Sequence, residues 1–89
     1  MIISAAVRIY DKRQDKTIII PVHRHADAFQ ILKDFGYKKN EDYISDQDDQ
    51  GFLDENYNFY SRLTARRMAF MAGQIKDTPY GELYSEDLW

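Results

Sequence analysis

The residues best suited to chemistry lie together in the segment His23-Arg24-His25-Ala26-Asp27. Two imidazoles and a carboxylate at this spacing match the H-x-H-x-D pattern with which metal-dependent hydrolases gather ligands around zinc. A zinc site needs three or four converging ligands from histidine, cysteine or carboxylate side chains. Because the chain has two histidines and no cysteine, we assign neither a metal nor another cofactor to this segment.

The same segment has a second interpretation, as a binding site for an anion. It precedes a predicted helix, whose first backbone N–H groups and positive dipole end attract negative charge. Arg24 and His25 add side-chain donors for a phosphate or carboxylate, and Asp27 would orient His25 or accept from a ribose or base. The structural alternative is a strand-to-helix junction in which His25 is partly buried and hydrogen-bonded and Asp27 caps the helix.

Two other charged clusters are weaker candidates for a site. Arg62, Arg66 and Arg67 form a basic group on one predicted helix, and a solvated helix face is the simplest interpretation. The adjacent carboxylates of Glu86 and Asp87 usually point apart, so capping or solvation is their expected role. A glycine-rich phosphate loop, a G-x-S-x-G elbow and an H-E-x-x-H helix are absent. We therefore assign no catalytic residue, and the sequence favours a protein that is not an enzyme.

Strands are predicted from the spacing of apolar and β-branched residues. Ile2–Ile9 alternates with a period of two, and Thr17–Val22 is rich in β-branched residues, as two arms of a hairpin would be. Gly51–Leu53 and Tyr57–Tyr60 flank a turn-forming Asp-Glu-Asn triplet and predict a second hairpin. The polar stretch Lys38–Gln50 between the hairpins is predicted to be a surface loop with room for a short strand.

Two segments change to helical spacing. His25–Phe35 has apolar residues at helical intervals and is followed by Gly36, while Arg62–Ala72 follows a capping Ser61 and carries a stripe of alanines. A chain of this length has room for one core. The elements therefore predict a single α+β domain over residues 1–89, in which a small antiparallel sheet of two β-hairpins packs with two α-helices in the order β-β-α-β-β-α. The apolar tail residues either complete the core or contact another subunit: Leu83, Tyr84, Leu88 and Trp89.

The composition restricts the partners. A net charge of −3 provides no general attraction for phosphate backbones, so nucleic acid is disfavoured. The absence of cysteine fits a reducing cytoplasm, and no segment is long and apolar enough for a membrane span or signal peptide. We expect a cytoplasmic protein with no membrane association. Seven Tyr, five Phe and one Trp exceed what one thin core hides, which predicts a homo-oligomer.

Four short motifs follow one another along the chain. They are Arg24-His25-Ala26-Asp27, Gln50-Gly51-Phe52, an R-x-x-A-x-x-x-A helix from Arg62 that runs into Gly73-Gln74, and Ser85-Glu86-Asp87-Leu88-Trp89. With these motifs in this order, the chain resembles over nearly its whole length a family of small phage and prophage proteins that carries no established activity. It departs from the family pattern at Thr64, where an acidic residue would complete a capping box, and at His23, which lies outside the pattern.

The resemblance implies a phage setting. Some small phage proteins counter host defence by sequestering cyclic-nucleotide or ADP-ribose-type signals between subunits. By this analogy we expect a phage accessory protein, located in the host cytoplasm, that binds an anionic, nucleotide-like small molecule without transforming it. The predicted binding residues are Arg24, His25, Asp27, Gln74, Ser85, Glu86 and Asp87.

Two other functions fit the same sequence. One is an interaction module that inhibits a host protein by docking an acidic surface on a basic partner. That surface would comprise Asp46, Asp48, Asp49, Glu86 and Asp87. The other is a small phosphodiesterase or nuclease in which His23 and His25 act as acid and base, although no third catalytic group accompanies them.

Overall fold

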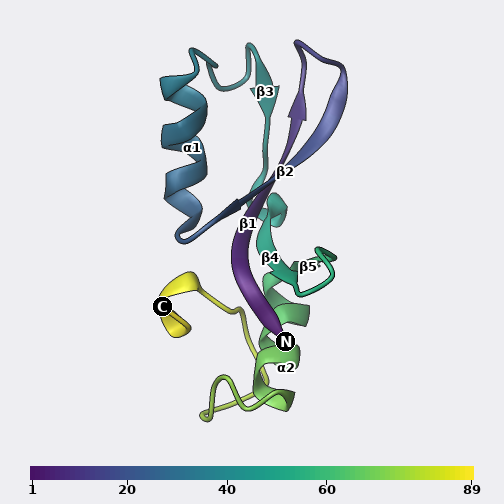
Figure 1. Cartoon of the computed structure of the whole chain (residues 1–89), viewed down its shortest axis with the longest axis vertical. Coiled ribbons are helices and arrows are strands. Elements are labelled where there is room, and N and C mark those ends of the chain that lie inside the picture. Colours follow the sequence, from purple (N-terminus) through teal and green to yellow (C-terminus); the bar gives the residue numbers. More distant parts are fainter.

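The computed structural model describes all residues from 1 to 89 and has the predicted α+β architecture (Figure 1). The helices and strands follow in the order β1 (Ile2–Asp11), β2 (Lys16–Val22), α1 (His25–Asp34), β3 (Tyr43–Ile44), β4 (Gln50–Asp54), β5 (Phe59–Ser61) and α2 (Arg62–Met71). Short 3-10 helices lie at Gln47–Asp49 and Ser85–Asp87. The predicted order β-β-α-β-β-α is confirmed, and β3 is the short strand for which the polar loop had room.

The sheet is antiparallel, with the strand order β2-β1-β4-β5 and β3 beside β1. Strand β1 is central, because it pairs with β2 on one side and with both β4 and β3 on the other. Strand β2 forms an edge of the sheet. Helix α1 begins directly after this edge strand, so the β2–α1 junction lies at the margin of the sheet (Figure 1).

The core lies on the face of β1 that carries Ala5, Val7 and Ile9, which are at most 1% exposed. Alternating side chains of a strand point to opposite faces, so these three residues share one side of the sheet. Both helices contribute to this one core, and of the alanine stripe predicted for the second helix two residues are buried in it, whereas Ala72 is exposed. The contributing helix residues are Ala28, Leu32, Ala65 and Ala69.

The tail after α2 belongs to the folded structure. Leu83 is fully buried, and its backbone N–H donates to the Arg62 carbonyl over 3.0 Å. Leu88 and Trp89 pack against the core from outside, whereas Tyr84 is largely exposed. The tail therefore completes the core, the first of the two alternatives that the sequence left open. In Figure 1 it runs as the yellow segment back toward the start of α1.

Two buried aspartates fix the hairpin turns. Asp54 accepts hydrogen bonds of 2.9 Å from the backbone N–H groups of Asn56 and Asn58, and these bonds, chiefly those from Asn58, lower the Asp54 pKa to about 2. Asp11 similarly accepts from two backbone N–H groups of the β1–β2 turn and from the Tyr37 hydroxyl.

Neither helix has the length and apolar character that a membrane crossing needs.

Candidate functional site

The β2–α1 junction presents the residues that the sequence singled out. Arg24 has an extended backbone and precedes the first turn of α1. The Asp27 carboxylate accepts from the Arg24 backbone N–H over 3.3 Å, and the Asp27 N–H donates back to the Arg24 carbonyl over 3.0 Å. The helix-capping alternative for Asp27 is thus observed, and it gives Arg24 a defined position at the helix start.

His25 points inward from the same junction. It is 8% exposed, and its Nε2 lies 2.8 Å from the carbonyl oxygen of Gly51. Because a carbonyl only accepts, Nε2 carries the proton and Nδ1 is the ring nitrogen left unprotonated in the neutral form. Burial lowers the His25 pKa, which favours this neutral form. The imidazole also meets Phe52 edge to face, with ring centroids 5.1 Å apart.

Arg24 connects the junction to the tail. Its Nη2 donates to the backbone oxygen of Trp89, while its Nη1 is buried and has no hydrogen-bond partner. Glu86 lies within reach of the same charge: its pKa is lowered first by its own backbone N–H, then by the Ser85 hydroxyl and by Arg24. Ser85 is buried and donates to the Glu86 carboxylate over 3.2 Å. The structure therefore brings together four of the seven predicted site residues, Arg24, His25, Ser85 and Glu86.

Arg62 belongs to the same neighbourhood, which the sequence did not reveal. Its Nη2 donates to the Gln50 side chain over 2.6 Å, its guanidinium lies 5.4 Å from the centre of the Tyr84 ring, and its charge contributes to the lowered pKa of His25. Its Nε is buried and unpaired. In the whole protein, Arg62 Nε and Arg24 Nη1 are the only buried side-chain N or O atoms without a hydrogen-bond partner.

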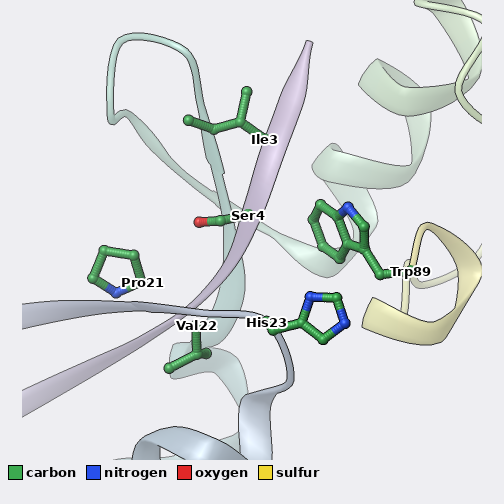
Figure 2. Close-up of a pocket in the computed structure, with 6 residues that line it drawn as sticks. All are labelled: Ile3, Ser4, Pro21, Val22, His23 and Trp89. Atoms are coloured by element: carbon green, nitrogen blue, oxygen red, sulfur yellow. The ribbon is translucent and has the colours of Figure 1, made fainter.

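A pocket of about 350 Å³ opens at the end of β2, next to His23 and Trp89 (Figure 2). None of the seven predicted site residues lines it, although Arg24 follows His23 in the chain and donates to the Trp89 backbone oxygen. Two of its walls are rings: His23 and Trp89 have centroids 5.8 Å apart and ring planes tilted by 44°. Figure 2 shows the indole and the imidazole next to each other, with the start of β1 and the end of β2 forming the rest of the pocket. The other lining residues are Ile3, Ser4, Pro21 and Val22. Its size is within the usual range for small-molecule sites.

The family described as phage T4 y16D protein matches residues 1–89. The chain belongs to this family. Comparisons with curated proteins and with solved structures give no match. The family assignment confirms the phage setting that the four motifs implied, and its description names no activity or ligand.

Three predicted site residues of this y16D-family chain make other contacts. Gln74 holds Ile2 with both ends of its amide, donating to the Ile2 carbonyl over 2.7 Å and accepting from the Ile2 N–H over 2.8 Å. Asp87 accepts from the Tyr84 backbone N–H over 2.8 Å, and Asp27 caps α1. These contacts stabilise the fold around the junction. They engage both polar atoms of the Gln74 amide and one carboxylate oxygen each of Asp27 and Asp87.

Arg66 corrects the prediction of a solvated basic helix face. It is 8% exposed and donates to the carbonyls of Thr78 and Glu82 over 3.0 and 3.3 Å, and to the Asp77 carboxylate over 2.7 Å. The prediction was wrong for Arg66 because the chain after α2 folds back over this side of the helix. Arg67, the next residue, is exposed as predicted.

The geometry also bears on the two rival functions. His23 is exposed beside Trp89, whereas the Nε2 of His25 is occupied by a backbone carbonyl, so the two imidazoles face different surroundings. No three His, Asp or Glu side chains converge as metal ligands would. In the acidic stretch, Asp49 pairs with Arg8 over 2.9 Å, which offsets part of the negative charge of that surface.

Proposed function

We propose that this phage protein binds an anionic, nucleotide-like small molecule at the β2–α1 junction and holds it without transforming it. The supporting observation is the pocket of about 350 Å³ that has His23 and Trp89 as ring-bearing walls. Arg24 follows His23 in the chain and donates to the Trp89 backbone oxygen. Stacking surfaces next to a guanidinium suit a molecule that joins a planar ring to a negative group.

The two halves of such a ligand would use different contacts. The planar ring would stack against Trp89 and His23, and base–aromatic stacking contributes about 1–3 kcal/mol per base. The anionic group would bind Arg24, whose Nη1 lacks a partner, near the first backbone N–H groups of α1. This requires a small shift of Trp89, whose backbone oxygen now occupies Nη2, and of Glu86, whose charge the anion would replace.

Binding without conversion fits the state of His25. An imidazole that exchanges protons in catalysis works best with a pKa near the working pH. Burial lowers the His25 pKa, and its Nε2 donates to the Gly51 carbonyl, which leaves Nδ1 as the one ring nitrogen without a partner. In a phage protein, holding such a molecule unchanged would remove a signalling compound from the infected cell. We therefore infer sequestration of a host defence signal as the biological role.

Thermal-shift measurements on the full chain, with a panel of mono-, di- and cyclic nucleotides and ADP-ribose, test the proposal. At least one compound should raise the melting temperature, and its affinity should then be measured by calorimetry. Arg24→Ala should weaken binding roughly ten- to a hundredfold, because a charge-assisted hydrogen bond is lost. Trp89→Ala should weaken it to a similar extent through lost stacking.

Arg67→Ala is the matched control, since it removes an exposed arginine from α2 and should leave binding unchanged. Two results would contradict the proposal: a panel in which no compound shifts the melting temperature, or Arg24→Ala and Arg67→Ala proteins that bind equally well. The first result would favour the interaction-module function, in which the acidic surface and not the junction contacts the host.

A further inference from the structure

Strand β2 leaves one side of the sheet without a hydrogen-bonding partner. It is the terminal strand in the order β2-β1-β4-β5, and it is seven residues long. The middle of the strand is Ile18-Ile19-Ile20, and no charged residue interrupts it between Lys16 and Val22. Natural edge strands usually carry charges or bulges that prevent pairing with another chain. Here such residues stand only at the two ends of the strand, Lys16 at its start and Pro21 near its end.

Pro21 also indicates which backbone groups face outward. The N–H and C=O of one residue in a strand point to the same side, and successive residues alternate. Because Pro21 has no N–H, it suits a position whose backbone faces away from β1, opposite Ala6. By alternation, Thr17 and Ile19 also face the open edge with both backbone groups.

An apolar groove of about 320 Å³ adjoins this edge on the face covered by α1. Ile18 and Ile20 of β2 form one side, and Ile31 and Phe35 of the helix region form the other. Phe35 is 75% exposed although its neighbours in the groove are apolar. An open strand edge and an uncovered apolar groove therefore lie next to each other.

We propose that β2 pairs with β2 of a second copy of this chain, antiparallel and around a two-fold axis at Ile19, so that the two sheets become one. In this register Ile19 exchanges both backbone hydrogen bonds with the partner's Ile19. The Thr17 N–H reaches the carbonyl of the partner's Pro21, so the missing proline N–H costs little. The surface is self-complementary, as a two-fold interface requires.

Side-chain pairing supports a second copy as the occupant. A two-fold axis perpendicular to the sheet keeps each face on its own side, so Ile18 lies beside the partner's Ile20 and the two apolar grooves join. Lys16 lies opposite the partner's Val22, and no like charges face each other along the edge. Because Val22 also lines the ligand pocket, each subunit would place a lysine next to the other's pocket, a consequence that rests on the proposed function.

Light scattering and native mass spectrometry of the full chain at high micromolar concentration test the interface. The unmodified protein should have twice the 10.6 kDa mass of one chain. Ile19→Lys places two positive charges at the axis and should return the mass to that of one chain. Ile44→Lys is the matched control, because Ile44 is 41% exposed against 38% for Ile19, and this variant should remain a dimer.

A cysteine at the axis gives a second measurement that does not depend on weakening the dimer. The chain has no cysteine, and hydrogen-bonded antiparallel neighbours have Cα atoms about 5.5 Å apart, which is within the range of disulfides. Ile19→Cys should therefore form a disulfide-linked dimer on mild oxidation, and Ile44→Cys should not. A monomer mass for the unmodified protein, or a dimer that persists in Ile19→Lys and fails to cross-link through Ile19→Cys, would overturn the proposal. Both readouts are independent of any ligand.

Discussion

Three arginines of the protein are bonded to very different extents: Arg66 on one hand, and Arg24 and Arg62 on the other. Arg66 is buried against the segment that follows α2, where it donates to two carbonyls and two carboxylates. Arg24 and Arg62 are also half covered by the tail and the β4 region, yet each keeps a buried nitrogen with no acceptor. The folded chain supplies acceptors for the guanidinium of Arg66 but leaves the guanidinium groups of Arg24 and Arg62 incompletely hydrogen-bonded.

An unpaired buried donor costs about 1–3 kcal/mol, so a fold selected for stability alone would not retain two of them. The difference separates an arginine that serves the fold from two arginines that the fold bonds incompletely. Arg66 stabilises the tail. Arg24 and Arg62 each keep one buried nitrogen without an acceptor in the chain, and under the proposed function Arg24 would bind the anion. Substituting each arginine separates these two roles.

The largest effect is expected for Arg66→Met. The variant keeps much of the side-chain volume but removes the donors to the carbonyls of Thr78 and Glu82 and to the carboxylate of Asp77. We expect the free energy of unfolding to fall by about 2–4 kcal/mol, measured by urea denaturation followed by circular dichroism. Arg67→Met on the exposed side of α2 should change it by less than about 0.5 kcal/mol. Equal stability of the two variants would remove the distinction between the arginines.

A smaller effect is expected from the pH dependence of His25. Its pKa in the folded protein is lowered below the usual 6.5, so the unfolded chain binds the proton more readily. Stability should be complete above pH 6.5 and fall as the pH decreases from there toward the folded-state pKa, with a slope below the one-proton limit of about 1.4 kcal/mol per pH unit. His25→Asn should abolish this slope, and His23→Asn should retain it. A slope unchanged in His25→Asn would assign the pH dependence to other groups.

The smallest effect is expected for Arg62→Met. This change removes the unpaired buried Nε, which stabilises the protein, but it also removes the hydrogen bond to Gln50 and the contact with the Tyr84 ring, which destabilises it. These contributions to the free energy of unfolding nearly cancel. The free energy of unfolding should change by less than about 1 kcal/mol in the same urea experiment. If Arg62→Met lowered the free energy of unfolding as much as Arg66→Met, Arg62 would also serve the fold. Of the three arginines compared, only Arg24 would then be free of a stabilising role.

The fold was predictable because its signals are local. The period of two in β1, the β-branched residues of β2 and the capping Ser61 of α2 each depend on neighbours in the sequence, and the structure confirms these three elements. The alternation of β1 breaks at its start, where the register with β4 shifts between Ile2 and Ser4, so that Ile2 is buried and Ile3 is exposed. The ends of the elements differ by one or two residues. Strand β1 extends to Asp11, beyond its apolar run, because the buried carboxylate organises the turn that follows.

The candidate residues were singled out from two short segments, Arg24–Asp27 and Ser85–Asp87, but the sequence did not show that these segments meet. Trp89 reaches the same place from the other end of the chain, through the long-range contact with Arg24, and no periodicity signals such an approach. Arg66 was misjudged for the same reason: its partners at Thr78 and Glu82 belong to a segment without regular structure.

The pairing of Gln74 with Ile2 has a consequence for the order in which the molecule is built. On the ribosome, β1 emerges first and can pair at once with β2, but an isolated two-stranded hairpin is only marginally stable. The other side of β1 can pair only after β4 has been synthesised, and the backbone of Ile2 is hydrogen-bonded by the side-chain amide of Gln74, 72 positions later. The central strand is therefore synthesised before the other strands of the sheet, yet it is fully bonded only when Gln74 is in place, so the sheet is complete only after the segment that follows α2 has joined it.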